Sequence, residues 1–230
     1  MIDEDSDHWT LRKCSQDLHD KLFASFGKVQ YTDSVAALLA EAHSRGTTPD
    51  QIKSYLHAIP FSPSMVKALE LMHAQNSDIL ILSDANTVFI DEILKSRNAK
   101  QYITRVISNP AYWRDDGMLV VKRHTTNPPH GCKDKRCGIN LCKGKELDAH
   151  VAQYGPYDRI VYCGDGANDA CPILRLAPKD AVVYRTGRRL EKILNADAQE
   201  RNPTVKTSII LPFTTGEDAL AHFTSILKSR

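Results

Sequence analysis

Short apolar runs alternate with helical patterns from residue 79 onward, and this alternation constrains the fold more than any other feature. The runs rich in β-forming residues are 79–82, 102–107, 119–121, 160–162, 181–184 and 208–211. Helical patterns lie at 86–94, 145–154 and 169–176. Strands that alternate with helices predict an α/β fold, a doubly wound parallel sheet with helices on both faces. Ligands of such sheets bind at the carboxyl ends of the strands, so polar residues that follow the runs are candidate site residues.

The N-terminal part of the chain lacks convincing strand patterns. Residues 31–42 carry apolar residues at helical spacing, and Thr48, Pro49 and Asp50 are typical of a helix start. We therefore expect residues 7–61 to form a small helical cap and residues 62–230 to form the α/β core.

Composition narrows the possible functions. The net charge of +2 favours neither a nucleic-acid nor a membrane partner, and no apolar run approaches the length that spans a bilayer. The N-terminal segment MIDEDSDHW is acidic and lacks the basic and apolar regions of a signal peptide. We expect a cytoplasmic protein whose six cysteines are thiols or metal ligands rather than disulfides.

Ser83 and Asp84 follow the first apolar run, in ILILSDAN, and a helical pattern begins near Asn86. Ser and Asp are preferred helix caps, so either side chain could simply cap that helix. Alternatively, the Ser83 hydroxyl and nearby backbone N–H groups bind a phosphate, a ligand that helix N-termini favour. The residues alone leave both interpretations open.

Asp165, Asn168 and Asp169 follow the run at 160–162, in the segment CGDGAND. Gly164 and Gly166 allow the backbone to turn sharply there. Several hard oxygen ligands at the end of a buried strand are suited to Mg²⁺. The alternative is an ordinary turn, because Asp and Asn readily form turns beside Gly.

Lys143 and Lys145 lie at the start of a predicted helix, in CKGKELD. Positive charge is unfavourable at a helix N-terminus, so a lysine there indicates an anion beside it. Two solvated lysines are the alternative, because lysine is usually exposed.

Residues 125–142 form a long loop that contains possible zinc ligands, namely His130, Cys132, Cys137 and Cys142. Cys and His suit zinc, although the C-x4-C-x4-C spacing differs from the usual paired C-x2-C. Free thiols that pack the loop are the alternative.

Taken together, these segments resemble the haloacid dehalogenase superfamily of phosphatases, in particular the group that contains phosphoethanolamine/phosphocholine phosphatase and pyridoxal-phosphate phosphatase. The resemblance spans nearly the whole chain and is carried by IDEDSD (2–7), AIPFSPSM (58–65), ILILSDANT (79–87), SNP (108–110), NLCKGK (140–145) and CGDGANDACP (163–172). GDG-x-ND alone marks only the superfamily, whereas SDANT and NLCK together with GDGANDACP are more specific.

The resemblance implies a Mg²⁺-dependent phosphomonoesterase that acts through an aspartyl-phosphate. Its substrate would be a small phosphate ester such as phosphoethanolamine, phosphocholine or pyridoxal phosphate. Most of the catalytic effect would come from positioning and electrostatic stabilisation. The implied roles are catalysis for Lys143 and Asp169, phosphate binding for Ser83, Asp84 and Lys143, and metal binding for Asp165 and Asn168.

One family motif, an apolar strand followed by D-x-D-x-T, would lie a few residues before IDEDSD and has no matching position. We therefore expect residues 1–6 to be a remnant of the first motif region, the first core strand to be missing and catalysis to be impaired. Its neighbours in the sheet would have exposed edges. Asp3 and Asp5 have the D-x-D spacing, but only two residues precede them, too few for a strand. A start codon placed too late, or a truncated variant, is the simpler hypothesis, which mapping the transcript's 5′ end tests.

Asp7 and Asp84 match positions near the family's active site that phosphoryl transfer does not use. Two carboxylates there would receive a cationic leaving group such as ethanolamine or choline, and helix capping is the alternative for both. Two other functions stay open. One is a non-catalytic phosphate- or metal-binding remnant of the fold, and the other is a metal-binding interaction module built on the cysteine loop.

Overall fold

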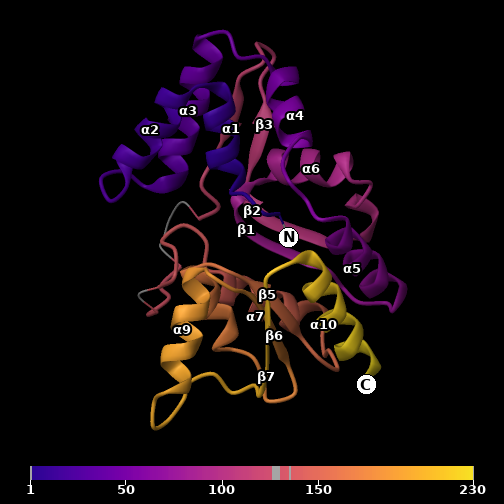
Figure 1. The fold of residues 1–230 in the computed structure, drawn as a ribbon. Helices are drawn as coiled ribbons and strands as arrows, with labels where there is room; N and C mark the ends of the chain where they lie inside the picture. Colours follow the sequence, from indigo (N-terminus) through magenta and orange to yellow (C-terminus); the bar gives the residue numbers. More distant parts are fainter. Residues whose placement is uncertain (1, 126–129, 135, 230) are drawn as a thin grey trace. The chain divides into compact units, whose positions relative to one another are not determined.

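The computed structural model describes residues 2–125, 130–134 and 136–229. The chain divides into two compact units, Met1–Thr126 and Asn127–Arg230 (Figure 1). Within the described residues, every helix is too short or too polar to cross a bilayer. The domain boundaries predicted from the sequence stay a prediction.

Four helices open the first unit: α1 (Ser6–Cys14), α2 (Gln16–Ser25), α3 (Tyr31–Ser44) and α4 (Pro49–His57). They contact one another through fully buried side chains, among them Leu11, Leu18, Leu22, Leu39 and Leu56. α4 begins as predicted, with Thr48 and Gln51 in a capping box and Pro49 in the first turn. Ile2 pairs with Phe61 as an isolated bridge, so the two ends of this helical segment are held together.

The rest of the first unit contains two small sheets. After α5 (Pro63–Ala74), strand β1 (Leu80–Asn86) leads into α6 (Thr87–Ser96) and pairs in parallel with β2 (Arg105–Asn109). β3 (Ala111–Trp113) and β4 (Leu119–Val121) form an antiparallel pair. The strand expected at 102–107 begins later, because a 3-10 turn, η1 (Lys100–Tyr102), precedes it.

The second unit is a three-stranded parallel sheet with helices. Its elements are α7 (Lys143–Tyr154), β5 (Val161–Gly164), η2 (Ala167–Asp169), α8 (Ala170–Ile173), β6 (Ala181–Arg185), α9 (Arg189–Ala198), β7 (Ile209–Phe213) and α10 (Gly216–Lys228). β6 is the central strand, and its residues Ala181, Val182 and Val183 are fully buried. α9 contacts β6 and α10 contacts β7, and the two helices flank the strands in Figure 1. The helix expected at 169–176 is shorter, because a 3-10 turn and a four-residue helix share the segment.

Parallel strands connected through helices confirm the predicted α/β class. Among the described residues, these strands form a two-stranded and a three-stranded sheet. β1 and β5, whose carboxyl ends carry predicted site residues, therefore each pair with another strand on one side only in this part of the chain.

Candidate active site

Lys143 and Asp169 form a buried ion pair in the second unit. Lys143 is the first residue of α7, and Asp169 ends the 3-10 turn that follows β5. Lys143 Nζ donates to Asp169 Oδ1 at 2.8 Å, and the two residues are only 8% and 3% exposed. The helix dipole disfavours an ammonium group at this helix start, and the carboxylate offsets that cost. The structure thus brings together the two residues that the sequence predicts to be catalytic.

Asp169 accepts three further hydrogen bonds. Its Oδ1 accepts from the Tyr162 hydroxyl at 2.7 Å, and its Oδ2 accepts from the backbone N–H groups of Asp165 and Gly166 at 3.0 and 2.8 Å. Burial alone would raise the pKa of Asp169, but the charge of Lys143 and the hydrogen bonds hold that pKa below its ordinary value. A carboxylate satisfied in this way stays ionised and keeps the lysine in place.

Asp165 and Asn168 belong to the turn that follows β5. The Asp165 backbone is fixed at both ends, because its N–H donates to Asp169 and its carbonyl accepts from Leu190 N–H at 3.0 Å. A Cβ at Gly166 would lie 2.7 Å from Asn168 Oδ1, so glycine is needed for this close approach. A carboxylate and an amide oxygen are ligands that Mg²⁺ prefers, so the donor set fits the ion expected here. The metal-binding roles themselves stay predictions.

Ser83 and Asp84 lie near the carboxyl end of β1 in the first unit, and neither caps α6. The N-cap of α6 is Asn86, whose side chain accepts from Phe89 N–H at 2.9 Å. Ser83 Oγ accepts from Ala85 N–H at 3.2 Å. The interpretation that either residue caps this helix is therefore wrong, while their predicted roles in binding phosphate stay predictions.

Asn109 fixes the backbone around Asp84, and sequence reasoning did not single it out as a site residue. It is 1% exposed, and its Nδ2 donates to the carbonyls of Asp84 and Ala85 at 2.6 and 2.8 Å. Its Oδ1 accepts from His124 N–H at 3.1 Å. The only signal in the sequence was its place in the segment SNP, where an asparagine follows an apolar run.

Asp7 is a buried carboxyl group near other acidic groups of the first unit. It is 4% exposed, and its Oδ1 has no hydrogen-bond partner among the described residues. The cap of α1 is Asp5, whose Oδ1 accepts from the N–H groups of Asp7 and His8 at 2.9 and 3.0 Å. Burial raises the pKa of Asp7 well above its ordinary value, and the charges of Asp5 and Asp84 raise it further. The capping alternative is therefore wrong for Asp7, which is a buried carboxyl group close to other carboxylates.

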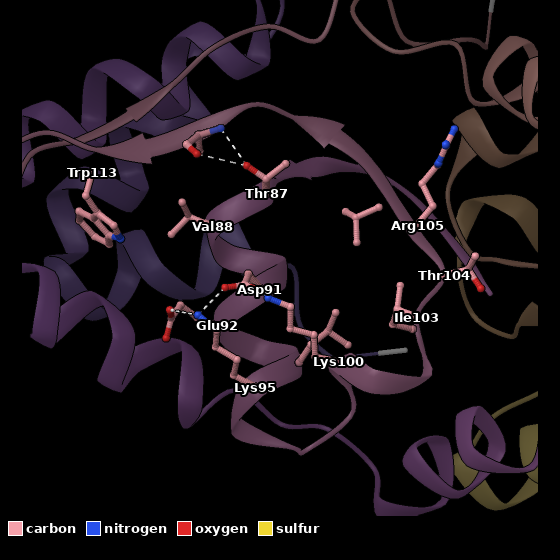
Figure 2. A pocket seen from close by; sticks show the side chains of 13 residues that line it. Thr87, Val88, Asp91, Glu92, Lys95, Lys100, Ile103, Thr104, Arg105 and Trp113 are labelled. Atoms are coloured by element: carbon pink, nitrogen blue, oxygen red, sulfur yellow. Dashed lines mark hydrogen bonds and ion pairs between the residues drawn. The ribbon is translucent and has the colours of Figure 1, made fainter. Parts of the chain in front are cut away.

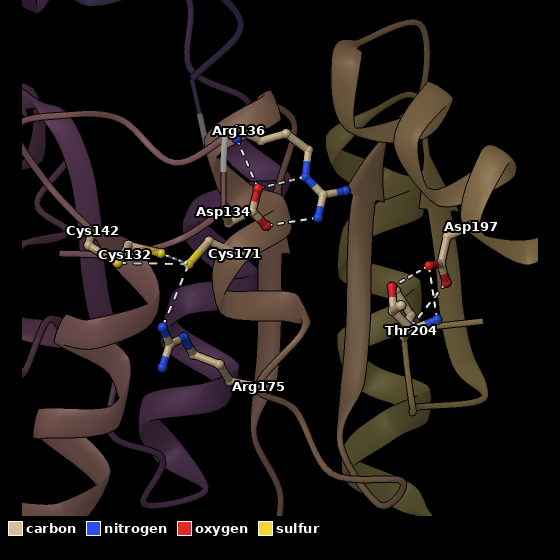
Figure 3. A network of polar contacts seen from close by, with 9 residues as sticks. Cys132, Asp134, Arg136, Cys142, Cys171, Arg175, Asp197 and Thr204 are labelled. Carbon is tan, nitrogen blue, oxygen red and sulfur yellow. Dashed lines mark hydrogen bonds and ion pairs between the residues drawn. The ribbon is translucent and has the colours of Figure 1, made fainter. Parts of the chain in front are cut away.

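Four cysteines meet in the second unit, with all four Sγ atoms within 4.8 Å of one another: Cys132, Cys137, Cys142 and Cys171. Figure 3 shows Cys132, Cys142 and Cys171. Cys171 lies in α8, and no spacing within the predicted ligand loop points to it. His130 is not in this cluster. Its Nδ1 accepts from Cys132 N–H at 3.1 Å, and its Nε2 donates to the Gly138 carbonyl at 2.6 Å, so both ring nitrogens are bound to the backbone.

A hollow of about 550 Å³ lies in the first unit beside α6 and β2 (Figure 2). None of the predicted site residues lines it. Asp91 forms ion pairs with Lys95 and Lys100, each at 2.6 Å, and Glu92 pairs with Lys95 at 3.4 Å, so two carboxylates offset the two lysines. The hollow is therefore a weaker candidate for binding an anion than the segments that follow β1 and β5.

Comparison with solved structures supports the fold. The structure superposes on a HAD family hydrolase from Salmonella enterica serovar Typhi with a TM-score of 0.57, at 17% identity, over 84% of this chain and 60% of that one. At this identity the likeness shows the fold alone.

Two curated relatives extend the comparison to sequence. Pyridoxal phosphate phosphatase PHOSPHO2 of Bos taurus is 32% identical over 236 residues, which cover 99% of this chain and 95% of that protein. Human phosphoethanolamine/phosphocholine phosphatase is 28% identical over 236 residues, which cover 100% of this chain and 86% of that protein. The family model described as "Putative Phosphatase" matches residues 1–227. The chain therefore belongs to this family of phosphatases, which has the haloacid dehalogenase fold.

Proposed function

We propose that the protein is a Mg²⁺-dependent phosphomonoesterase that hydrolyses a small phosphorylated metabolite. The buried pair of Lys143 and Asp169 after β5 carries this proposal. A lysine held by an ionised carboxylate is positioned in advance, so its ammonium group can stabilise a phosphoryl group at no further cost in ordering. Ser83, which is free of the capping role, would bind phosphoryl oxygens through its hydroxyl group.

Asp165 and Asn168 would hold the metal ion. When bound, Mg²⁺ neutralises charge on the phosphate and orients it. The residues of this chain supply the fixed frame, since Asp169 accepts the N–H groups of Asp165 and Gly166 and thereby shapes the turn.

An aspartyl-phosphate mechanism needs a nucleophilic carboxylate, and Asp5 is unsuited to that role because it caps α1. Residues 1–230 contain no D-x-D-x-T segment. We therefore expect low turnover from this polypeptide alone, and higher turnover when an apolar strand ending in D-x-D-x-T is joined before Ile2. Phosphate binding without turnover in both versions would favour the alternative, a non-catalytic remnant.

Phosphate release tests the proposal. Both versions are assayed with and without Mg²⁺ on phosphoethanolamine, phosphocholine, pyridoxal phosphate and pyrophosphate. We expect Mg²⁺-dependent release by the extended version and a loss of about 10²–10³-fold in kcat when Lys143→Met is introduced, the size typical of removing one electrostatic stabiliser. Absence of release from the extended version with every substrate would contradict the proposal.

We further propose that Asp7 and Asp84 bind a cationic leaving group. The support is the raised pKa of Asp7, which burial and the nearby carboxylates produce and which a bound cation would reverse. One relative is named for phosphoethanolamine and phosphocholine, both of which carry a cationic group. Among the described residues, none forms an ion pair with Asp7. A bound cation would therefore be attracted to these carboxylates without displacing another cation from Asp7.

The leaving-group proposal is tested with Asp84→Asn in the extended version. We expect kcat/KM to fall about tenfold or more for phosphoethanolamine, because one close charge contact in a sheltered site contributes more than about 1.4 kcal/mol. Turnover of glycerol phosphate, whose leaving group is uncharged, should change little. Asp50→Asn serves as the matched control, since the Asp50 side chain is 93% exposed. Equal losses for the two esters would reject the role of Asp84.

A further inference from the structure

The four clustered cysteines come from three different pieces of the second unit. Cys132 and Cys137 lie in the loop before α7, Cys142 is the N-cap of α7, and Cys171 lies in α8. Cys132 Sγ and Cys142 Sγ lie 3.6 and 3.7 Å from Cys171 Sγ (Figure 3). Segments separated in sequence thus bring four sulfur atoms to one point.

Two of the sulfur–sulfur distances match those of a metal site. Four thiolates around a tetrahedral ion with Zn–S bonds of about 2.3 Å lie about 3.8 Å apart, close to the 3.6 and 3.7 Å between Cys171 and its two neighbours. A disulfide would need the sulfurs at about 2.05 Å. Four sulfur ligands in a tetrahedral arrangement are typical of zinc.

Two hydrogen-bond donors reach the sulfur atoms and would stabilise thiolates bound to a metal ion. Lys145 N–H, in the first turn of α7, donates to Cys142 Sγ at 3.4 Å. The Arg175 guanidinium donates to Cys171 Sγ at 3.9 Å. Four thiolates around Zn²⁺ leave a net negative charge, which a guanidinium and a helix N-terminus both stabilise.

Gly144 makes room for this arrangement. A Cβ at that position would lie 2.7 Å from Cys171 Sγ and would also collide with Arg175. Only glycine therefore allows α8 to bring its cysteine against the first turn of α7.

We propose that Cys132, Cys137, Cys142 and Cys171 bind one structural Zn²⁺ ion. On binding, each thiol gives its proton to solvent and each thiolate forms one bond to the ion. Cys142 directly precedes Lys143, and Cys171 lies two residues after Asp169. The ion would therefore fix the two segments that carry the buried ion pair.

Metal content is the direct test, and it does not depend on phosphatase activity. The protein is purified under reducing conditions and analysed by elemental mass spectrometry, where we expect about one zinc per chain, as in closed four-cysteine sites. Replacement of zinc by Co²⁺ should give the visible absorption of a tetrahedral tetrathiolate centre. A chain that contains no zinc and takes up neither metal would overturn the proposal. Bound iron in place of zinc, or an intact mass two hydrogens lower that reveals a disulfide, would overturn it as well.

Variants test the ligand set. Cys137→Ser should lose the bound zinc and the tetrathiolate cobalt spectrum, whereas Cys14→Ser, a matched change in the first unit, should keep both. Gly144→Ala keeps all four cysteines but crowds Cys171 Sγ, so we expect a metal affinity about 10–100-fold weaker, as for other changes beside a metal site. If Cys137→Ser fails to fold, the cobalt spectrum of the unaltered chain still decides the ligand type. Full zinc retention in a folded Cys137→Ser variant would exclude Cys137 as a ligand.

Discussion

The two units each bury an aspartate, and the two aspartates differ in how their charge is compensated. Asp169 in the second unit accepts four hydrogen bonds, one of them from Lys143, and its pKa is lowered. Asp7 in the first unit has an Oδ1 without a partner among the described residues, and its pKa is raised. Burial acts on both residues in the same direction, so the partners account for the difference.

The comparison separates two uses of a buried carboxyl group. A satisfied carboxylate holds other groups in place, as Asp169 holds Lys143 and the turn after β5. An unsatisfied one reduces stability, and a protein retains such a group mainly where a ligand supplies the missing charge. Asp169 is thus a positioning residue in our proposal, and Asp7 is part of a binding site.

The largest expected effect is that of Asp169→Asn, which leaves the buried Lys143 ammonium without its carboxylate. We expect the free energy of unfolding of the second unit to fall by about 3–5 kcal/mol, the usual cost of breaking a buried ion pair. Both tryptophans, Trp9 and Trp113, lie in the first unit, so hydrogen exchange of α7 is the suitable measurement. Asp158→Asn, at an exposed position, is the control.

The stability contributed by the two aspartates should change with pH in opposite directions. Because the folded-state pKa of Asp169 is lowered, its contribution to stability is present above the ordinary aspartate pKa and is lost as the pH falls through the folded-state value. The protection of α7 in the unaltered chain should therefore fall in acid, and that of Asp169→Asn should change less. Equal protection of the two chains at neutral pH would show that the ion pair does not hold α7.

A smaller effect of opposite sign is expected for Asp7→Asn. The folded-state pKa of Asp7 is raised, so the folded chain loses stability as the pH rises from about 4, the ordinary aspartate pKa, through the folded-state value. Removing the ionisable group should stabilise the first unit by about 1–3 kcal/mol at neutral pH, the penalty of an unsatisfied buried group. The gain should vanish near pH 4. Urea unfolding of the first unit, followed by the fluorescence of Trp9 and Trp113, measures it, and a loss of stability at neutral pH would contradict the interpretation.

Local patterns predicted much of this fold and part of the site. The strands and helices after residue 79 follow from apolar periodicity, and Lys143 and Asp169 follow from polar residues placed at strand ends and helix starts. The helix predicted at 169–176 is present but shorter, because a 3-10 turn precedes Ala170 and the N–H groups of Arg175 and Leu176 bond three residues back rather than four.

The remaining site features depend on contacts between distant segments. Cys171 completes the sulfur cluster from a segment 29 residues beyond Cys142, and loop spacing carries no information about it. Asn109 reaches the carbonyls of Asp84 and Ala85 across paired strands. Such partners appear only once the sheet register is known. The cap of α6 is a local feature, yet sequence reasoning considered Ser83 and Asp84 for it, and the structure shows Asn86.

The smallest predicted effects concern Asn86 and Ser83 at the end of β1. Asn86 caps a helix, whereas Ser83 is proposed to bind phosphate, so the two variants should differ in stability and in binding. Asn86→Ala removes the acceptor for Phe89 N–H and should lower the free energy of unfolding of the first unit by about 1 kcal/mol. Ser83→Ala removes only an acceptor for Ala85 N–H at a half-buried position, so its cost should stay near a few tenths of a kcal/mol. Inorganic phosphate binding, measured by calorimetry on both variants, should show the reverse order, with the larger loss for Ser83→Ala. A Ser83→Ala chain that binds phosphate as well as the unaltered chain would leave the end of β1 with a structural role alone.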